Sequence, residues 1–213
     1  MRSIHVSMLS LVAVAAIFAQ APIFAQAPRG WKVRVDRSTS ASDPDASGSI
    51  KFVTMGAGFH ATNPQAAVYW NPANTVSGTY TLQGTFTLMK PSGHTNYYGL
   101  IFGGSALEGP QQKYLYFTVA QDGTWLIKRR DGDTGTSTIA QQQSSAVKTP
   151  DATGKSINAL EVRVGADKID YVVNGMVVHT TPKSGFTAKT AGIYGIRINH
   201  LLEVQVDGLT SSK

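Results

Sequence analysis

The acidic residues are the first candidates for chemistry in this chain, because two carboxyl groups about 5 Å apart can hydrolyse a glycosidic bond. The chain has three glutamates, Glu108, Glu161 and Glu203, and none lies two or three residues from another acid. A catalytic pair would have to come from separate strands, such as Glu108 or Asp122 with Asp131. The sequence alone therefore assigns no catalytic residue.

Two short acidic segments point to metal binding, since Ca²⁺ prefers several carboxylate and carbonyl oxygens. Asp131 and Asp133 stand in the segment DGDTG and are the calcium candidates, although the same residue types are common in hairpin turns. Asp43 and Asp45 flank a proline in a serine-rich loop and are weaker candidates. No other cofactor is expected.

Histidine, cysteine and glycine patterns exclude several further classes of site. The histidines after the N-terminal segment show no H-x-H or H-x-x-x-H spacing, so zinc is not predicted; they are His60, His94, His179 and His200. The chain has no cysteine, which excludes disulfides, thiolate metal sites and a cysteine nucleophile. It has no G-x-S-x-G elbow, and its segment GLIFGG precedes no predicted helix, so neither a serine hydrolase nor a phosphate loop is indicated.

Alternating apolar residues predict the strands that would position such groups. Segments 160–164 and 169–173 alternate with period two, and the C-terminal third reads as four strands. Asn174-Gly175 is the strongest hairpin signal, because both central residues of that turn need a positive φ. Further strands are predicted at 31–35, 50–55, 66–70, 78–89, 96–103, 113–120, 124–130 and 136–140. With no helix predicted, this pattern indicates an all-β, antiparallel, two-sheet jelly-roll sandwich.

The strand faces predict a ligand site. In the segment 97–103, Tyr98, Leu100 and Phe102 would face the core, and the opposite face would carry Tyr97 above an open floor of glycines. Aromatic rings stack on sugar rings and polar side chains bond their hydroxyls. The candidate ligand-binding residues on this face and its rim are Tyr97, Tyr114, Tyr116, Arg129, His94, Asn96 and Trp70. For each tyrosine, packing in the core is the alternative.

Two blocks of sequence resemble the concanavalin A-like lectin/glucanase superfamily. The block NALEVRVGADKIDYVVNGMVV is similar to a strand pair of laminin-G-like domains and of family 16 glycoside-hydrolase-related modules. The ending GIYGIRINHLLEVQVDGL resembles modules similar to 3-keto-disaccharide hydrolases. The resemblance spans most of residues 31–209 and implies a concanavalin A-like sandwich. The E-x-D-x-x-E strand that carries catalysis in family 16 enzymes is missing here.

The N-terminal segment has the pattern of a secretory signal peptide over residues 1–25, with an apolar run at 8–19 that is too short to span a membrane. Cleavage is expected after Ala19 or Ala25, leaving one sandwich domain over residues 26–213. The protein is therefore expected to be secreted or periplasmic, without membrane insertion.

The charge pattern bears on the partner. The formal net charge is +6, but the basic residues are dispersed apart from Lys128-Arg129-Arg130, which argues against nucleic acid. The sequence predicts a secreted, carbohydrate-binding, lectin-like module that recognises a glycan or polysaccharide on a concave sheet face. The alternatives are a glycoside hydrolase or 3-keto-disaccharide hydrolase-like enzyme, and a non-catalytic adhesion or assembly module with a protein partner.

Overall fold

The computed structural model describes residues 27–38 and 40–213. The predicted signal peptide lies outside these described residues, so its assignment stays a prediction. Within the described ranges, no helix is long and apolar enough to span a membrane.

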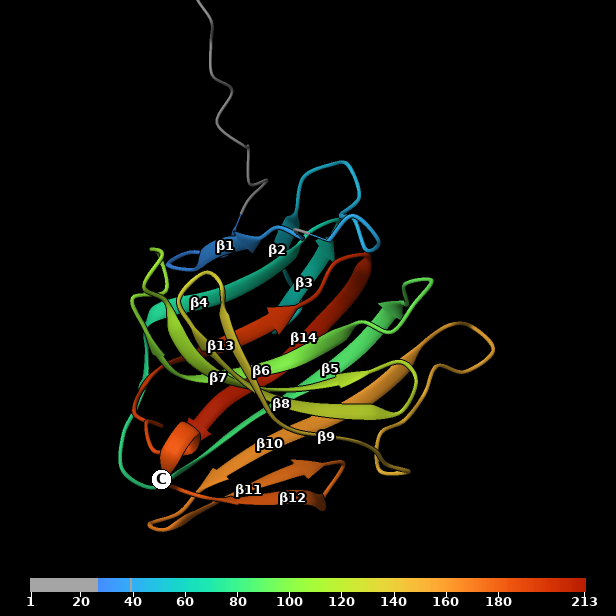
Figure 1. Cartoon of the computed structure of the whole chain (residues 1–213). Helices are drawn as coiled ribbons and strands as arrows, with labels where there is room; N and C mark the ends of the chain where they lie inside the picture. Colours follow the sequence, from blue (N-terminus) through green and yellow to red (C-terminus); the bar gives the residue numbers. More distant parts are fainter. Residues whose placement is uncertain (1–26, 39) are drawn as a thin grey trace, which may run out of the picture.

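In the described part of the chain, two antiparallel sheets of seven strands each pack face to face (Figure 1). Sheet I contains, in spatial order, β1 (Lys32–Asp36), β4 (Ala66–Val76), β13 (Gly192–Ile198), β6 (Tyr97–Ser105), β7 (Lys113–Ala120), β8 (Thr124–Asp131) and β9 (Gly135–Gln143). Sheet II contains β12 (Met176–Pro182), β11 (Lys168–Val173), β10 (Ser156–Val164), β5 (Tyr80–Lys90), β14 (Leu202–Ser212), β3 (Gly58–Asn63) and β2 (Lys51–Met55). A single 3₁₀ turn, η1 (Gly185–Thr187), is the only helical element of the described residues. The predicted all-β jelly-roll sandwich is confirmed.

The predicted strands match most of the observed ones, although some bounds differ, as in β4, which extends beyond the predicted 66–70. Strand β3 was missed because its sequence, GFHATN, mixes small and polar residues and lacks a clear apolar alternation. The C-terminal third forms five strands, β10 to β14, rather than four. The Asn174-Gly175 turn between β11 and β12 has φ values of 50° and 82°, as predicted for this type of hairpin.

The core lies between the inward faces of the two sheets. Tyr98, Leu100 and Phe102 of β6 are all fully buried in it, as the alternation of that segment predicted. Sheet II contributes the apolar residues of β10, β11 and β5 to the same cluster. Each large apolar side chain removed from water in this way stabilises the fold by about 1.5–3 kcal/mol. The two faces of sheet I are thereby fixed, one toward the core and one outward.

A smaller apolar cluster covers part of the outward face of sheet I. It consists of Val68, Trp70, Ile101, Leu107, Tyr114 and Tyr116. Leu107 belongs to the loop between β6 and β7, so this loop folds back over the sheet. The outward face of sheet I is therefore partly covered around Tyr114, Tyr116 and Trp70.

Candidate functional site

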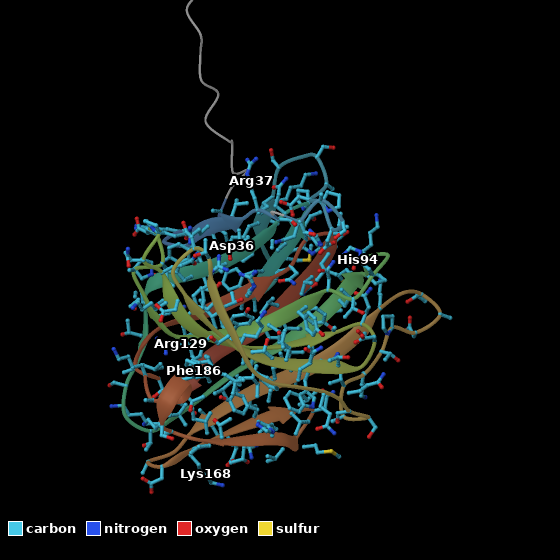
Figure 2. The ribbon with its side chains drawn as sticks, in the orientation of Figure 1. Asp36, Arg37, His94, Arg129, Lys168 and Phe186 are labelled. Carbon is cyan, nitrogen blue, oxygen red and sulfur yellow. The ribbon has the colours of Figure 1, made fainter. Side chains whose placement is uncertain are left out.

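A hollow of about 400 Å³ lies over the outward face of sheet I, which is within the usual size range of small-ligand sites. Side chains from the ends of β1, β8, β9 and β13 line it, together with the loops that follow β1, β5 and β13. The lining residues are Asp36, Arg37, Ser38, Asp43, Asp45, Ala66, Asn96, Arg130, Asp133, Thr134, Thr136, Arg197, Asn199 and His200. We call this space the sheet I hollow; Figure 2 labels Asp36 and Arg37 at its β1 side.

Asp36, the last residue of β1, is the centre of a buried ion-pair cluster in the sheet I hollow. Arg197 Nη1 lies 2.5 Å from Asp36 Oδ2 and 2.9 Å from the hydroxyl oxygen of Tyr114. Arg130 Nη2 lies 3.6 Å from Asp36 Oδ1, and the Asp36 side chain is only 7% exposed. Because each charged group is oriented by another, their hydrogen-bonding directions toward the hollow are fixed.

A second ion pair joins the two edges of sheet I. Arg34 Nη2 on β1 lies 2.5 Å from Asp133 Oδ1 in the turn between β8 and β9. Gln112 Nε2 donates to both Asp133 Oδ1, at 3.1 Å, and Asp36 Oδ1, at 3.5 Å. Since β1 and β9 are the edge strands of this sheet, the sheet must curve strongly for these groups to meet. The sheet I hollow therefore lies on a concave face.

The charges of this cluster stabilise one another. Burial by itself would raise the pKa of Asp36, but Arg197 and Arg130 outweigh it and hold that pKa below its ordinary value. Burial would likewise lower the pKa of Arg197, yet its contacts with Tyr114 and Asp36 outweigh burial and raise it. Burial raises the pKa of Tyr114 to about 12. Asp36 and Arg197 are thus charged, and Tyr114 is a neutral donor, at neutral pH.

The lining of the sheet I hollow is polar and nearly balanced in charge. It contains four aspartates and three arginines, with amide and hydroxyl groups from Asn96, Asn199 and Thr136 among the rest. Among the residues that the structure describes, no phenylalanine, tyrosine or tryptophan lines the hollow. A ligand in this hollow would be held by hydrogen bonds rather than by aromatic stacking.

Three of the predicted ligand-binding aromatics are buried instead of open. Tyr114, Tyr116 and Trp70 do lie on the outward face of sheet I, but they are 2%, 6% and 2% exposed beneath the small apolar cluster. Arg197 covers the Tyr116 ring, with its guanidinium carbon 5.4 Å from the ring centre. The expectation of an open tyrosine platform was therefore wrong, because the β6–β7 loop and Arg197 cover these rings.

The open glycine floor expected beside Tyr97 is also not present. A Cβ atom on Gly99 would lie 2.3 Å from the carbonyl oxygen of Phe117, and one on Gly103 would lie 2.6 Å from that of Lys189. These glycines allow close approach of neighbouring backbone and leave no space for a ligand. Tyr97 itself is half-buried, and its hydroxyl accepts a hydrogen bond from Gln141 Nε2 at 3.1 Å.

Arg129 does not line the sheet I hollow; Arg130 does. Arg129 lies opposite Leu115 in the β7–β8 pairing, on the core side of the sheet, and its Nη2 lies 2.7 Å from Asp131 Oδ2. Its guanidinium packs 5.7 Å from the centre of the Phe186 ring, and Figure 2 shows both residues well away from Asp36. The alternation of β8 explains the difference, since neighbouring residues of a strand point to opposite faces.

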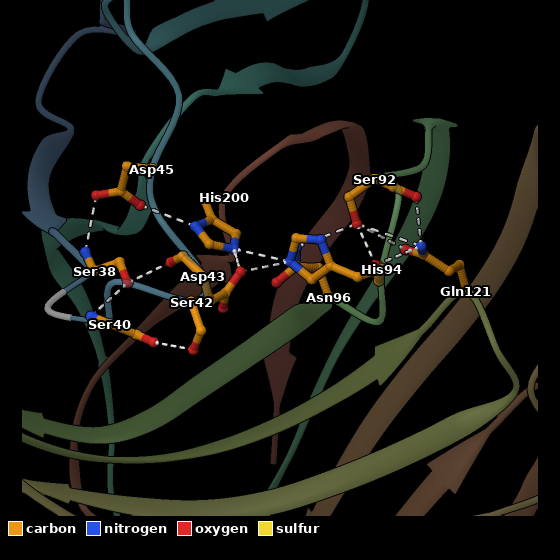
Figure 3. A network of polar contacts seen from close by, with 10 residues as sticks. All are labelled: Ser38, Ser40, Ser42, Asp43, Asp45, Ser92, His94, Asn96, Gln121 and His200. Carbon is orange, nitrogen blue, oxygen red and sulfur yellow. Dashed lines mark hydrogen bonds and ion pairs between the residues drawn. The ribbon is translucent and has the colours of Figure 1, made fainter.

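Asn96 and His94 are two of the predicted ligand residues that the structure places at or beside the hollow. Asn96 is 3% exposed and lines it. His94 joins a polar network with Asp43 and His200, drawn in Figure 3. The nearest ligand atoms of these three residues lie within 4.8 Å of one another, a spacing that a single metal ion could bridge. No local motif predicted this group, because its members are far apart in the sequence.

The two calcium candidates do not form a cluster of free carboxylates. Lys113 Nζ lies 3.0 Å from Asp131, which also pairs with Arg129, and these cations lower the pKa of that carboxyl. Asp133 is paired with Arg34 and accepts from Gln112, which lowers its pKa as well. Both carboxylates are thus used in ion pairs between side chains.

The acids considered for a hydrolytic pair lie in different places. Glu108 pairs with Lys32 beside Trp31, in a separate hollow. Asp122 borders another hollow near Lys148 and accepts a hydrogen bond from Thr95. The structure therefore does not bring Glu108 or Asp122 into the sheet I hollow.

Known proteins resemble this chain in fold but not in sequence. No family model matches the chain, and no curated protein matches it. The carbohydrate-binding module CBM66 from Bacillus subtilis superposes with a TM-score of 0.60 at 12% identity, covering 86% of this chain and 96% of the module. A Bacteroides ovatus mixed-linkage glucan PUL GH16 protein, solved in complex with a G4G4G3G product, has a TM-score of 0.59 at 6% identity, and the match covers 89% of this chain and 98% of that protein.

A third solved structure is a Bacillus subtilis protein of unknown function with a galectin-like fold. Its TM-score is 0.57 at 13% identity, and the match covers 85% of this chain and 88% of that protein. Identities this low carry information about the fold alone. The chain has the jelly-roll fold of the concanavalin A-like and galectin-like lectins and glucanases.

Proposed function

We propose that this protein is a non-catalytic carbohydrate-binding module whose ligand occupies the sheet I hollow. The observation that carries the proposal is the hollow itself: a concave, polar space of about 400 Å³ over the outward face of sheet I, lined by pre-oriented donors and acceptors. Sugars present closely spaced hydroxyls that both donate and accept, and alternating carboxylates, amides and guanidiniums match that pattern.

The charge balance of the lining favours a neutral glycan over an acidic one. Four aspartates face three arginines in the hollow, although the whole chain carries a net charge of +6. An acidic polysaccharide would need an excess of cations where it binds, and would meet the carboxylates of Asp43 and Asp45 here. The hydroxyl groups of a neutral glycan can donate to the aspartates and accept from the arginines, so both kinds of side chain can bind them.

The hydrolase alternative has less support. Asp36 and Asp133 share a hydrogen-bond donor in the hollow, since Gln112 Nε2 donates to both. A glycosidase needs one carboxyl whose pKa is raised so that it can protonate the leaving oxygen. The pKa values of Asp36 and Asp133 are both lowered, by arginine contacts, so neither suits the acid role.

A glycan array tests the proposal, run once with calcium and once with chelator. Three proteins are compared: the wild type, the double variant Arg37→Ala/Asn199→Ala, and the control Arg163→Ala on β10 of sheet II. Arg37 and Asn199 line the hollow and have no side-chain partner among the described residues, so the double variant should fold normally. Specific binding by the wild type and the control, lost in the double variant, supports the proposal.

Two results of the array would go against it. Equal binding by all three proteins would move the glycan site elsewhere, and absence of binding to any glycan would favour a protein-binding assembly module. Release of shortened oligosaccharides during the assay would favour the hydrolase.

The proposal includes export. The apolar N-terminal segment supports a secreted or periplasmic location, where glycans and polysaccharides are available as ligands.

A further inference from the structure

Three side chains from distant parts of the chain converge beside the sheet I hollow (Figure 3). Asp43 lies in the loop after β1, His94 in the loop between β5 and β6, and His200 in the turn between β13 and β14. Asp43 Oδ1 lies 2.8 Å from His94 Nε2 and 3.1 Å from His200 Nε2, and the two Nε2 atoms lie 3.2 Å apart. The three ligand atoms therefore surround one small space.

From this geometry we infer that Asp43, His94 and His200 form a binding site for a divalent transition-metal ion of the zinc type. The ligand atoms of a tetrahedral zinc ion lie about 3.3 Å from one another, given Zn–N and Zn–O bonds of about 2.0–2.1 Å. The three observed distances are close to this spacing. Two imidazoles and one carboxylate suit first-row transition metals, whereas Ca²⁺ and Mg²⁺ prefer oxygen alone.

The hydrogen bonds around the group are compatible with two unprotonated Nε2 atoms beside the Asp43 carboxylate. His200 Nδ1 lies 2.9 Å from Asp45 Oδ1, so the Nδ1–H donates to that carboxylate, and the neutral imidazole would present the lone pair of Nε2 to a metal ion. His94 Nε2 lies 3.0 Å from Asn96 Nδ2, so without metal its single lone pair can accept from that amide, and a bound ion would take the place of the amide. Together with the carboxylate oxygen of Asp43, three electron-rich atoms face one another, and a cation would stabilise them.

Protons alone satisfy this arrangement poorly. If both Nε2 atoms carried a hydrogen, both N–H groups could donate to Asp43. The two N–H donors would then lie only 3.2 Å apart, measured between their nitrogens. The His94 N–H would also face the amide nitrogen of Asn96, which is itself a donor. A bound metal ion removes both conflicts.

Side chains outside the group hold its members in place. The Asp45 carboxylate, besides binding His200, accepts the Ser38 backbone N–H at 2.8 Å. Gln121 Nε2 donates to the backbone carbonyls of Ser92 and His94, at 2.8 and 2.7 Å, which fixes the loop that carries His94. Outer partners of this kind orient the ligating side chains at metal sites.

The site is accessible and lies next to the hollow. The side chains of Asp43 and His94 are 47% and 43% exposed, whereas that of His200 is 5% exposed. Asp43 and His200 also line the sheet I hollow, so a fourth ligand position would be available to water or to a hydroxyl of a bound molecule. The metal site does not require the proposed glycan function, but a bound divalent ion would offset the Asp43 carboxylate and make the charge of the lining more positive.

The test is a calorimetric titration of Zn²⁺ into the untagged full-length protein after removal of metals with a chelator. We expect one ion per chain, and Co²⁺ in its place should give the visible absorption of a low-coordinate N/O site. His94→Ala and Asp43→Ala should each weaken Zn²⁺ binding more than about 100-fold, because each removes one of three ligands. Asp45→Asn should weaken it about 10- to 100-fold, as loss of an outer partner does.

His60→Ala is the matched control, because His60 Nε2 also faces a carboxylate, Glu203, at 3.0 Å, but without a second histidine. It should bind Zn²⁺ as the wild type does. Thermal unfolding without metal verifies that each variant is folded, which is expected for His94→Ala because that side chain is exposed. Absence of stoichiometric Zn²⁺ binding, or wild-type affinity in folded His94→Ala, would overturn the inference and leave an ion-paired histidine network.

Discussion

Asp36 is the residue on which the geometry of the sheet I hollow depends most. Its carboxylate faces Arg197, Arg130 and Arg34, with atoms between 2.5 and 3.8 Å apart. Removing a charge that pairs with buried arginines leaves those arginines without compensation, which is more costly than losing an exposed ion pair. Asp36 therefore supports both the fold and the orientation of the lining.

Asp36→Asn should lower the free energy of unfolding by about 3 kcal/mol at pH 7. The pKa of Asp36 is lowered in the folded protein, so its ionised form contributes stability above the unfolded pKa of about 3.9. That contribution is lost as the pH falls through the folded pKa. The difference between variant and wild type should thus shrink below about pH 4.

Urea denaturation of both proteins at pH 7 and at the lowest pH where they remain folded measures this difference. Glu161→Gln, which removes an exposed pair with Arg163, is the control and should change stability by less than about 0.5 kcal/mol. A constant difference between wild type and Asp36→Asn at all pH values would contradict the assignment of a charged Asp36.

Individual site residues were harder to predict from the sequence than the strands. The alternation in β6 and β7 placed Tyr114 and Tyr116 on the outward face, but it carries no information about the loop that covers them. Arg129 was predicted and Arg130 was not, because which of two neighbouring arginines faces the hollow depends on the strand's register. No sequence pattern marked Asp36 as a site residue, because a single aspartate at the end of a strand is common.

Strand β10 shows how an inward polar residue can fix a loop. Asn158 is fully buried, and its Oδ1 accepts from Lys148 N at 2.8 Å and from Asn174 Nδ2 at 2.9 Å. Its Nδ2 donates to the carbonyl oxygen of Lys148 at 3.0 Å. The loop after β9 and the β11–β12 turn are thereby joined through one side chain.

Asn158→Ala should lower the free energy of unfolding by about 2 kcal/mol, because the backbone groups of Lys148 lose their partners. The neighbouring residue provides the control. Ile157 is 56% exposed, so Ile157→Thr should change stability by less than about 0.5 kcal/mol. Equal effects of the two substitutions in urea denaturation would show that this side chain does not anchor the loop.

The strands themselves were predictable where period-two alternation was strong. β10 and β11, with the Asn174-Gly175 turn, followed directly from the sequence. β3 did not, since GFHATN has too few apolar residues to show a face, and it becomes a strand through pairing with β14 and β2. Whether such a segment becomes a strand depends on the strands it pairs with in the folded protein.

The whole molecule brings together segments that no sequence motif connects. Asp43, His94 and His200 come from three loops at one end of the sandwich, and Arg34 meets Asp133 only because sheet I is curved. The fold class was therefore predictable from local patterns, while the hollow and the candidate metal site depend on the path of the complete chain. The residues proposed for the hollow and the metal site could not be grouped before the sheets were assembled.

The proposed signal peptide predicts where the exported protein begins. Cleavage after Ala19 or Ala25 should give a chain that begins at Gln20 or Gln26. Ala27 packs against the core, so either cleavage leaves the described fold complete. Intact-mass measurement of the protein recovered outside the cytoplasm decides between the two sites, and a mass that includes Met1 would contradict the signal-peptide assignment.

The measurement that tests the central claim most directly is backbone-amide NMR of the protein titrated with the glycan that the array selects. Binding in the sheet I hollow predicts progressive, saturable shifts of the amides of Arg37, Thr136 and Asn199, with little change in β10, β11 and β12 of sheet II. Shifts confined to sheet II, or to the hollow beside Lys148, would contradict the assignment of the sheet I hollow as the carbohydrate site.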